Sequence, residues 1–277
     1  MSDFSLYDFH PGLERLEIVD LGAADDPKWP PAYKPLMRAG RARVTGFEPD
    51  LVACLALSSK YKPPHRFFPV CAGDGRPARF HTTTYTQTSS LLEPNTPLLK
   101  LFHALHELTT PVSDAEVKTV RLDDAIAPDD DVDYLKLDVQ GSELTVLQGG
   151  ERVLGGAVAL QIEVSFAELY RGQPLFADVD VYLRKQGFWL HLFPGLDAVT
   201  MNPFRTGGRQ VLWTDVVYTR HPQELDALSE AKLWKLALVL HDIYRSYDFA
   251  HACLAEIDRR AGDRTQAERY RARLEQA

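Results

Sequence analysis

Short apolar runs alternate with amphipathic segments along most of the chain. The apolar runs end in polar or glycine-containing turns, a pattern that predicts strands. Strands are expected over residues 16–22, 43–49, 66–73, 132–139 and 158–165. Segments 51–61 and 142–154 lie between these runs and have the pattern of helices. This alternation of strands and helices favours βαβ units and a parallel sheet.

Two later apolar runs and one polar excursion extend this pattern. Residues 187–193 and 210–220 are predicted to supply further strands, with an antiparallel pair as one arrangement. Residues 76–110 contain a β-prone Thr/Ser run, so an extra strand or loop is expected there rather than a helix. Excursions of this length are often functional loops.

Acidic residues mark two shorter features before residue 132. Asp123 and Asp124 are predicted to begin a short helix. The run Asp129 to Asp131 is predicted to be a solvated loop, because adjacent like charges repel and rarely share a buried site.

From about residue 222 the pattern becomes helical. Leu233, Leu236, Leu240 and Ile243 recur at the spacing of an amphipathic helix, and residues 260–263 are predicted to form a turn before a last, charged helix. We therefore divide the chain into residues 1–221 and a helical appendage over 222–277. Structural packing is the simplest role for this appendage, and a homodimer contact or a single helical-repeat hairpin are the alternatives.

Composition narrows the classes of protein. The 277 residues are 45% hydrophobic and 25% charged, which is ordinary for a globular chain. The net charge of -8 provides no basic stripe for phosphates, so no nucleic-acid partner is expected. Cys54, Cys71 and Cys253 lack the spacing of a disulfide framework or a cysteine zinc site. No apolar run suits a membrane span or a secretory signal, and we expect a cytoplasmic protein.

Two acidic residues follow the first two predicted strands. Asp20 ends the first strand and is followed by Gly22, and Glu48 ends the second. Ligands of open parallel sheets bind beyond the carboxyl ends of the strands, where a glycine permits close approach to the backbone. An acid at the position of Glu48 accepts hydrogen bonds from ribose hydroxyls in doubly wound folds.

The loop after the first strand argues for a particular cofactor. A dinucleotide site carries GxGxxG, but this loop reads GAADDPKWPP, with Asp25 and Asp26 where a pyrophosphate would be repelled. S-adenosylmethionine, which combines an adenosine with a cationic end, fits better. Asp20 would then face its amino group.

Several motifs, in order along the chain, resemble the FkbM family of S-adenosylmethionine-dependent methyltransferases. They are IVDLGA, GFEPD, AGDGRPARF with a downstream TSSL, VKTVRLDDAI, DYLKLDVQGSELTVLQGGERVL and LQIEVS. The resemblance covers about residues 16 to 220. It implies a Rossmann-like class I methyltransferase fold of the α/β class, with a mostly parallel doubly wound sheet. It also implies methyl transfer to a hydroxyl of a sugar, a glycan or another natural product.

The resemblance also assigns residues by position. It places Asp20, Gly22 and Ala23 at the methionine end of the cofactor, Glu48 at the ribose and Asp74 at the adenine. Ser90, with Ser89 before it, matches a serine pair of the family and is predicted at the cofactor site. The first loop departs from the family pattern: Pro27, Pro30, Pro31 and Pro35 follow the two acids, which predicts a short or displaced first helix.

Methyl transfer to an alcohol requires help in removing its proton. The candidate catalytic groups are Asp138, Glu163 and a histidine near the pocket, for which we take His191. The alternative is a divalent cation, magnesium or calcium, bound by Asp138, Glu143 and Glu163. The sequence does not decide between a base and a metal. A nucleotide-binding oxidoreductase and a non-catalytic binding module on the same fold are the alternative functions.

Overall fold

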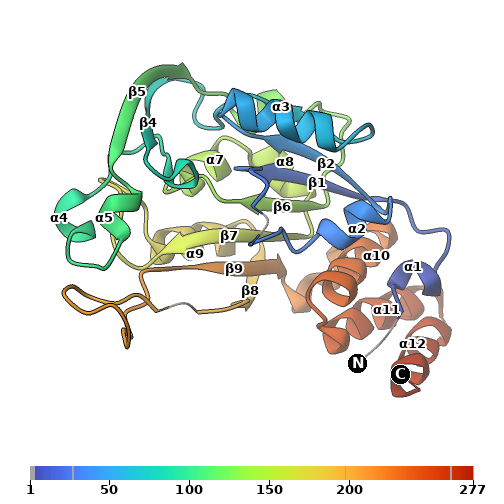
Figure 1. Ribbon diagram of the computed structural model, residues 1–277. Coiled ribbons are helices and arrows are strands. Elements are labelled where there is room, and N and C mark those ends of the chain that lie inside the picture. Colours follow the sequence, from blue (N-terminus) through green and yellow to red (C-terminus); the bar gives the residue numbers. More distant parts are fainter. Residues whose placement is uncertain (1–3, 27, 197, 263, 277) are drawn as a thin grey trace.

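A twisted seven-stranded sheet forms the centre of the computed structural model, which describes residues 4–26, 28–196, 198–262 and 264–276 (Figure 1). The strand order is β3-β2-β1-β6-β7-β9-β8. The strands of this sheet are β1 (Leu16–Leu21), β2 (Ala42–Phe47), β3 (Arg66–Phe68), β6 (Tyr134–Leu137), β7 (Ala159–Ser165), β8 (Phe188–Leu192) and β9 (Trp213–Arg220).

The sheet is doubly wound and mostly parallel, as predicted. The neighbouring pairs from β3 to β7 are parallel, whereas β9 runs antiparallel to both β7 and β8. The order reverses between β1 and β6, so the loops after these two strands open a crevice at the carboxyl edge, where doubly wound folds bind ligands. The predicted strands are confirmed, although β3 is shorter than expected.

Helices α7 (Glu143–Gln148), α8 (Glu151–Gly156) and α9 (Phe176–Lys185) cover one face of the sheet. The prediction of a single helix over 142–154 was wrong, because the helix breaks at Gly149 and Gly150. A β carbon on Gly149 would lie 2.7 Å from the carbonyl oxygen of Gly73, and one on Gly150 would lie 2.8 Å from the Leu122 side chain. This close packing requires glycine, and it divides the segment into two short helices.

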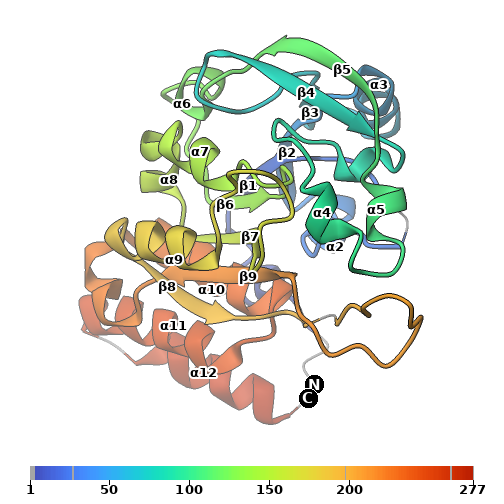
Figure 2. The same ribbon diagram turned by 90° about the vertical axis from the view of Figure 1, so that its left-hand side faces the viewer.

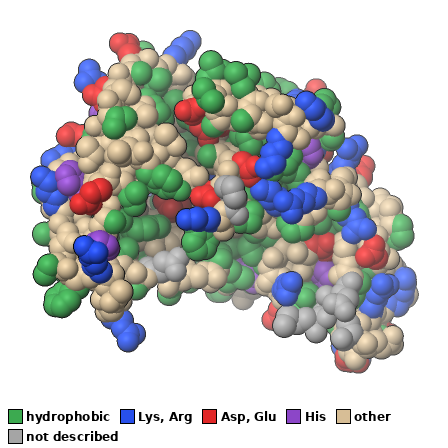
Figure 3. All heavy atoms as spheres, viewed as in Figure 1, with side chains coloured by type: hydrophobic (Ala, Val, Ile, Leu, Met, Phe, Trp, Pro, Cys, Tyr) green, Lys and Arg blue, Asp and Glu red, His purple; other side chains and the backbone are tan. Residues whose placement is uncertain are grey.

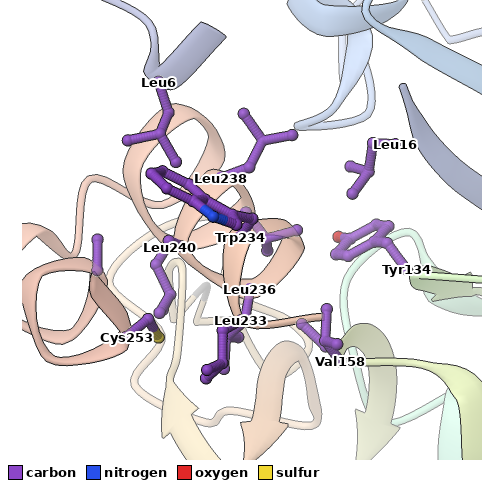
Figure 4. Packing of buried hydrophobic residues seen from close by; sticks show 14 of the residues in the cluster. Leu6, Leu16, Tyr134, Val158, Leu233, Trp234, Leu236, Leu238, Leu240 and Cys253 are labelled. Atoms are coloured by element: carbon purple, nitrogen blue, oxygen red, sulfur yellow. The ribbon is translucent and has the colours of Figure 1, made fainter. Parts of the chain in front are cut away.

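The C-terminal helices cover the opposite face. They are α10 (Glu230–Leu238), the π-helical turn η3 (Val239–Ile243), α11 (Tyr247–Ala261) and α12 (Thr265–Glu275), preceded by η2 (Pro222–Ala227). Leu233 and Leu236 are fully buried and belong to the same cluster as Leu16, Tyr134 and Val158 of the sheet (Figure 4). The helices predicted after residue 222 are therefore present and share a core with the sheet. The boundary at 221/222 stays a prediction.

The excursion after β3 forms a separate antiparallel ribbon of β4 (Pro77–Thr83) and β5 (Pro111–Lys118). The predicted extra strand is confirmed. The structure adds the short helices η1 (Thr86–Thr88), α4 (Thr96–Leu99) and α5 (Leu105–Leu108) to it. Figure 2 looks onto the carboxyl edge of the main sheet and shows this excursion framing it.

The remaining elements are short. Helices α1 (Leu6–Phe9), α2 (Lys34–Arg38), α3 (Leu51–Lys60) and α6 (Leu122–Ala125) complete the fold. Helix α2 confirms the short first helix expected after the prolines, although Pro27 itself lies outside the described residues. Helix α6 confirms the short helix at Asp123, and α11 ends at the left-handed Gly262 before the last helix; Asp263 lies outside the described residues.

The acidic run before β6 forms ion pairs, whereas a solvated loop was predicted. Asp130 forms ion pairs with Arg43 at 3.2 Å and Arg66 at 3.0 Å, and Asp131 pairs with Lys232 of α10 at 2.7 Å. These cations come from strands and a helix distant in the sequence, which is why the sequence alone predicted a solvated run.

Candidate active site

Asp20 lies at the end of β1 beside the crevice and is 3% exposed. Its Oδ2 accepts a hydrogen bond from the Tyr33 hydroxyl, whereas Oδ1 has no hydrogen-bond partner among the described residues. Burial raises the pKa of Asp20, although Lys136 and Tyr33 counteract it. A buried acceptor atom without a partner is costly unless a ligand supplies a donor. Asp20 is therefore a candidate ligand contact.

Gly22 and Ala23 turn the chain away from β1 directly after Asp20. Both backbone N–H groups donate to the carbonyl of Phe47, at 3.0 Å and 3.1 Å. Gly22 has a φ of +80°, and a β carbon there would lie 1.9 Å from the carbonyl oxygen of Asp138. Only glycine allows the loops after β1 and β6 to approach so closely.

Glu48 and Asp74 lie on the side of β2 and β3. Glu48 is 7% exposed and accepts the N–H of Asp50 at 2.9 Å through Oε1, which leaves its other oxygen able to accept from a ligand. Burial raises its pKa. Asp74 lies in the loop after β3, with a half-exposed carboxylate that accepts the N–H of Arg76 at 2.9 Å. Their ribose and adenine contacts stay predictions.

Asp138 follows β6 across the crevice from Asp20. Its Oδ2 lies 3.2 Å from Nζ of Lys136, and its Oδ1 accepts a hydrogen bond from the Gln140 amide at 2.6 Å. The side chain is 35% exposed, whereas that of Asp20 is 4% exposed. Lys136 and Gln140 therefore fix the orientation of the carboxylate, one at each oxygen, and the carboxylate is still accessible to a substrate.

Lys136 is the buried cation of the site. Its Nζ also lies 3.9 Å from Oδ1 of Asp20. Burial disfavours its charge, but Asp138, Asp20 and Asp215 outweigh this and raise the pKa of Lys136. One ammonium thus offsets several carboxylates that would otherwise repel one another.

Glu143 and Glu163 have different surroundings from Asp138. Glu143 opens α7 and accepts the backbone N–H groups of Val139 and Gly141, and its burial raises its pKa to about 7. Glu163 accepts from the Gln140 amide at 3.1 Å and lies opposite Asp215 in the β7–β9 register. Burial, and then the charge of Asp138, raise the pKa of Glu163 well above its usual range. Glu143 thus holds the loop, and the surroundings of Glu163 disfavour a second negative charge beside Asp138.

Ser90 and Tyr170 join the excursion to the Asp138 loop. The Ser90 hydroxyl donates to the carbonyl of Gln140 at 2.6 Å and accepts the N–H of Leu92 at 2.9 Å. The Tyr170 hydroxyl donates to the Gln140 side chain at 2.9 Å. These contacts hold Gln140 in its left-handed conformation, with a φ of +55°. Ser89 accepts the N–H of Thr83 within the excursion. A cofactor contact for Ser90 stays a prediction.

The structure does not place His191 with these acids. This histidine is on β8 at the edge of the sheet, and Nε2 lies 2.7 Å from the Ser246 hydroxyl while the ring packs on Phe249. Burial lowers its pKa. His191 therefore connects β8 to the C-terminal helices, two strands away from Glu163.

The acids do not form a metal site among the described residues. No three His, Cys, Asp or Glu side chains there are grouped so that they could hold an ion. The Glu143 carboxylate is directed at backbone N–H groups, and Glu163 is directed at the Gln140 amide. This donor set does not fit the predicted magnesium or calcium ion.

Sequence reasoning missed Lys136, Gln140, Tyr33 and Asp215. Lys136 on β6 and Asp138 just after it are two residues apart, a spacing that puts both on one face, and the sequence contains this signal. Asp215 is likewise a lone acid within an apolar strand. Tyr33 comes from the proline-rich loop and could not have been assigned to Asp20, because no periodicity connects the two.

The strand order, the reversed β9 and the acids around the β1/β6 crevice define a Rossmann-like methyltransferase fold. The chain belongs to the methyltransferase FkbM domain family, whose model matches residues 20–190, and thereby to the S-adenosylmethionine-dependent methyltransferases. This membership favours methyl transfer over the alternative of a nucleotide-binding oxidoreductase.

Two solved methyltransferase structures show distant similarity to this chain. Precorrin-6y C5,15-methyltransferase from Geobacter metallireducens GS-15 is 10% identical, with 75% of this chain and 82% of that chain covered and a TM-score of 0.34. A SAM-dependent methyltransferase from Aquifex aeolicus is 13% identical, with 78% and 87% covered and a TM-score of 0.31. At these scores neither likeness carries an argument about this chain.

One curated protein matches a short stretch. Kunitz-type trypsin inhibitor 1 from Selenicereus undatus is 31% identical in an alignment 99 residues long, which covers 30% of this chain and 84% of that protein. Its name describes that protein alone. The mostly parallel sheet and the free, buried Cys54, Cys71 and Cys253 give no support to an inhibitor function here.

Proposed function

We propose that this methyltransferase acts on oxygen, transferring a methyl group to a hydroxyl of a sugar, glycan or natural-product metabolite. The observation that carries the proposal is the carboxylate of Asp138, which is partly exposed and oriented by Lys136 and Gln140 at the carboxyl edge of the sheet. An acid held in this way suits the removal of a proton from an alcohol.

S-adenosylmethionine fits the other half of the crevice. The unpartnered Oδ1 of Asp20 would accept a hydrogen bond from its amino group, and the free acceptor of Glu48 would receive the ribose hydroxyls. Gly22 and Ala23 would allow the methionine end to approach the backbone, and Asp74 would meet the adenine. When bound, this cofactor supplies a methyl group already activated on a sulfonium.

Each residue on the acceptor side then has a defined task. Asp138 accepts the proton of the acceptor hydroxyl, Gln140 orients the carboxylate, and Lys136 offsets the surrounding negative charge. Burial and the charge of Asp138 raise the pKa of Glu163, which disfavours a second negative charge beside the carboxylate. The excursion between β4 and β5 frames the acceptor entrance and is expected to set specificity.

Among the described helices, none has both the length and the apolar character that a membrane crossing requires. We propose a small-molecule or glycan acceptor and a cytoplasmic location. A homodimer through the C-terminal helices stays a prediction, as does a purely structural role for them.

Transfer of a labelled methyl group from S-adenosylmethionine to a panel of hydroxyl compounds tests the proposal. Asp138→Asn should abolish most turnover while leaving cofactor affinity and folding nearly unchanged, because the amide preserves the shape and cannot accept the proton. Product methylated on nitrogen or carbon would refute the acceptor chemistry. Turnover by Asp138→Asn with an unchanged pH profile would refute the role of Asp138.

A further inference from the structure

A basic hollow lies between α2 and α3, beside the loop that follows β1. It is open to solvent, has a volume of about 430 Å³ and is lined by Lys34, Arg38, Lys60, Asp25, Ala32 and the prolines Pro30, Pro31 and Pro35. Figure 3 shows Lys and Arg side chains gathered in this place, on the same face as the central hollow in which acidic side chains are visible.

The charges of this hollow do not cancel. Asp25 is the one acid in its lining, against three basic residues, so the lining has a net charge of +2 in a chain whose net charge is -8. Asp25 pairs with Nζ of Lys34 at 2.5 Å and also with Nζ of Lys60. Burial works against the Asp25 charge, but these two lysines lower its pKa. Among the described residues, no carboxylate pairs with Arg38, so its guanidinium is available to a ligand.

The hollow is also close to the cofactor loop. Pro30, Pro31 and Pro35 fix the backbone on one side, so little conformational entropy is lost when a ligand binds. Asp25 follows Ala23 by two residues, which places their Cα atoms at most about 7 Å apart. The hollow therefore lies beside the loop that carries the candidate cofactor residues Gly22 and Ala23.

We propose that this hollow binds an oxyanionic group, a phosphate or a carboxylate, and that the acceptor of the methyl group carries it. The second half of this statement rests on the proposed function, whereas the anion site does not. Arg38 offers a planar fork of donors to the oxyanion, and Lys60 adds a point charge at the rim. Asp25 acts as a resident counter-ion that keeps the two lysines in place and weakens the site.

Calorimetric titration of the full chain tests the anion site, with inorganic phosphate and malonate as separate probes. The stronger binder identifies phosphate or carboxylate as the preferred group. We expect saturable binding that falls about tenfold in Arg38→Ala or Lys60→Ala, since each removes a charge-assisted hydrogen bond. Asp25→Asn should tighten binding several-fold, a gain that a merely structural role of Asp25 would not produce.

Lys62→Ala is the matched control, because Lys62 is an exposed lysine two residues from Lys60 and outside the lining. It should bind both probes like the unmodified chain. Absence of saturable binding, or equal binding by Arg38→Ala, would overturn the anion site. Titration of the same variants with S-adenosylmethionine separates the two proposals: failure of cofactor binding in the unmodified chain would refute the proposed function and leave the anion result standing.

Discussion

Gly22 faces the carbonyl oxygen of Asp138 so closely that a β carbon at position 22 would lie 1.9 Å from it. This contact joins the loop after β1, which carries the candidate cofactor residues, to the loop after β6, which carries the candidate base. The two halves of the site are therefore fixed relative to one another by backbone packing at a glycine.

Replacing Gly22 with Ala should consequently destabilise the protein and misalign the site. The backbone at position 22 is left-handed, which disfavours alanine, and the new methyl group would make a contact too short for any carbon atom. The free energy of unfolding should therefore fall by about 2–4 kcal/mol. Gly40→Ala is the control, because Gly40 has a φ of +69° and a β carbon there would have nothing within 4 Å. Urea unfolding should show a clearly larger loss for Gly22→Ala. Equal losses would mean that the contact with Asp138 adds nothing.

Asp20→Asn should weaken binding of S-adenosylmethionine by at least about tenfold, because the unpartnered acceptor is replaced by an amide that cannot attract an ammonium group. Its effect on folding should be small or stabilising, since a buried carboxyl is neutralised while Tyr33 keeps an acceptor. Calorimetry and urea unfolding measure the two effects. Unchanged affinity would remove Asp20 from the cofactor site.

Lys136→Met should lower stability by about 3–5 kcal/mol at pH 8, because Asp20, Asp138 and Asp215 lose the cation that offsets them. Burial raises the pKa of Asp20 and of Asp215, and their protonation relieves the repulsion, so the variant should recover stability relative to the unmodified chain as the pH falls towards 5. Lys118→Ala, at an exposed lysine of β5, provides the control. A loss that is independent of pH would show that Lys136 acts through packing alone.

Glu143 makes stability depend on pH in a defined direction. Burial raises its pKa from 4.5 to about 7. Between pH 4.5 and about pH 7 the folded state therefore still holds a proton that the unfolded state has released. The contribution of this group is present below about pH 4.5 and is lost as the pH rises to about 7, a change of up to about 3 kcal/mol. Glu143→Gln mimics the protonated acid and should remove this decline. The difference in melting temperature between the two chains, followed from pH 5 to 8, measures it; a constant difference would contradict the assignment.

The sequence predicted the strands, their parallel arrangement and the acids at the ends of β1, β2 and β6, because these features follow from local apolar runs and motif positions. It did not predict the break between α7 and α8, which depends on packing of Gly149 and Gly150 against distant residues. It also could not show that Lys136 is shared by three acids or that Tyr33 binds Asp20. These contacts join segments far apart in the sequence, and only the fold brings them together. The same reason explains why His191 was grouped with the catalytic acids although the sheet separates them.

Titration of the protein with S-adenosylhomocysteine, the demethylated cofactor, tests the central claim most directly. The account predicts saturable binding of one molecule per chain, weakened by about tenfold or more in Glu48→Ala because a buried acceptor of the ribose hydroxyls is lost. Absence of binding by the unmodified chain, or equal binding by Glu48→Ala, would contradict it.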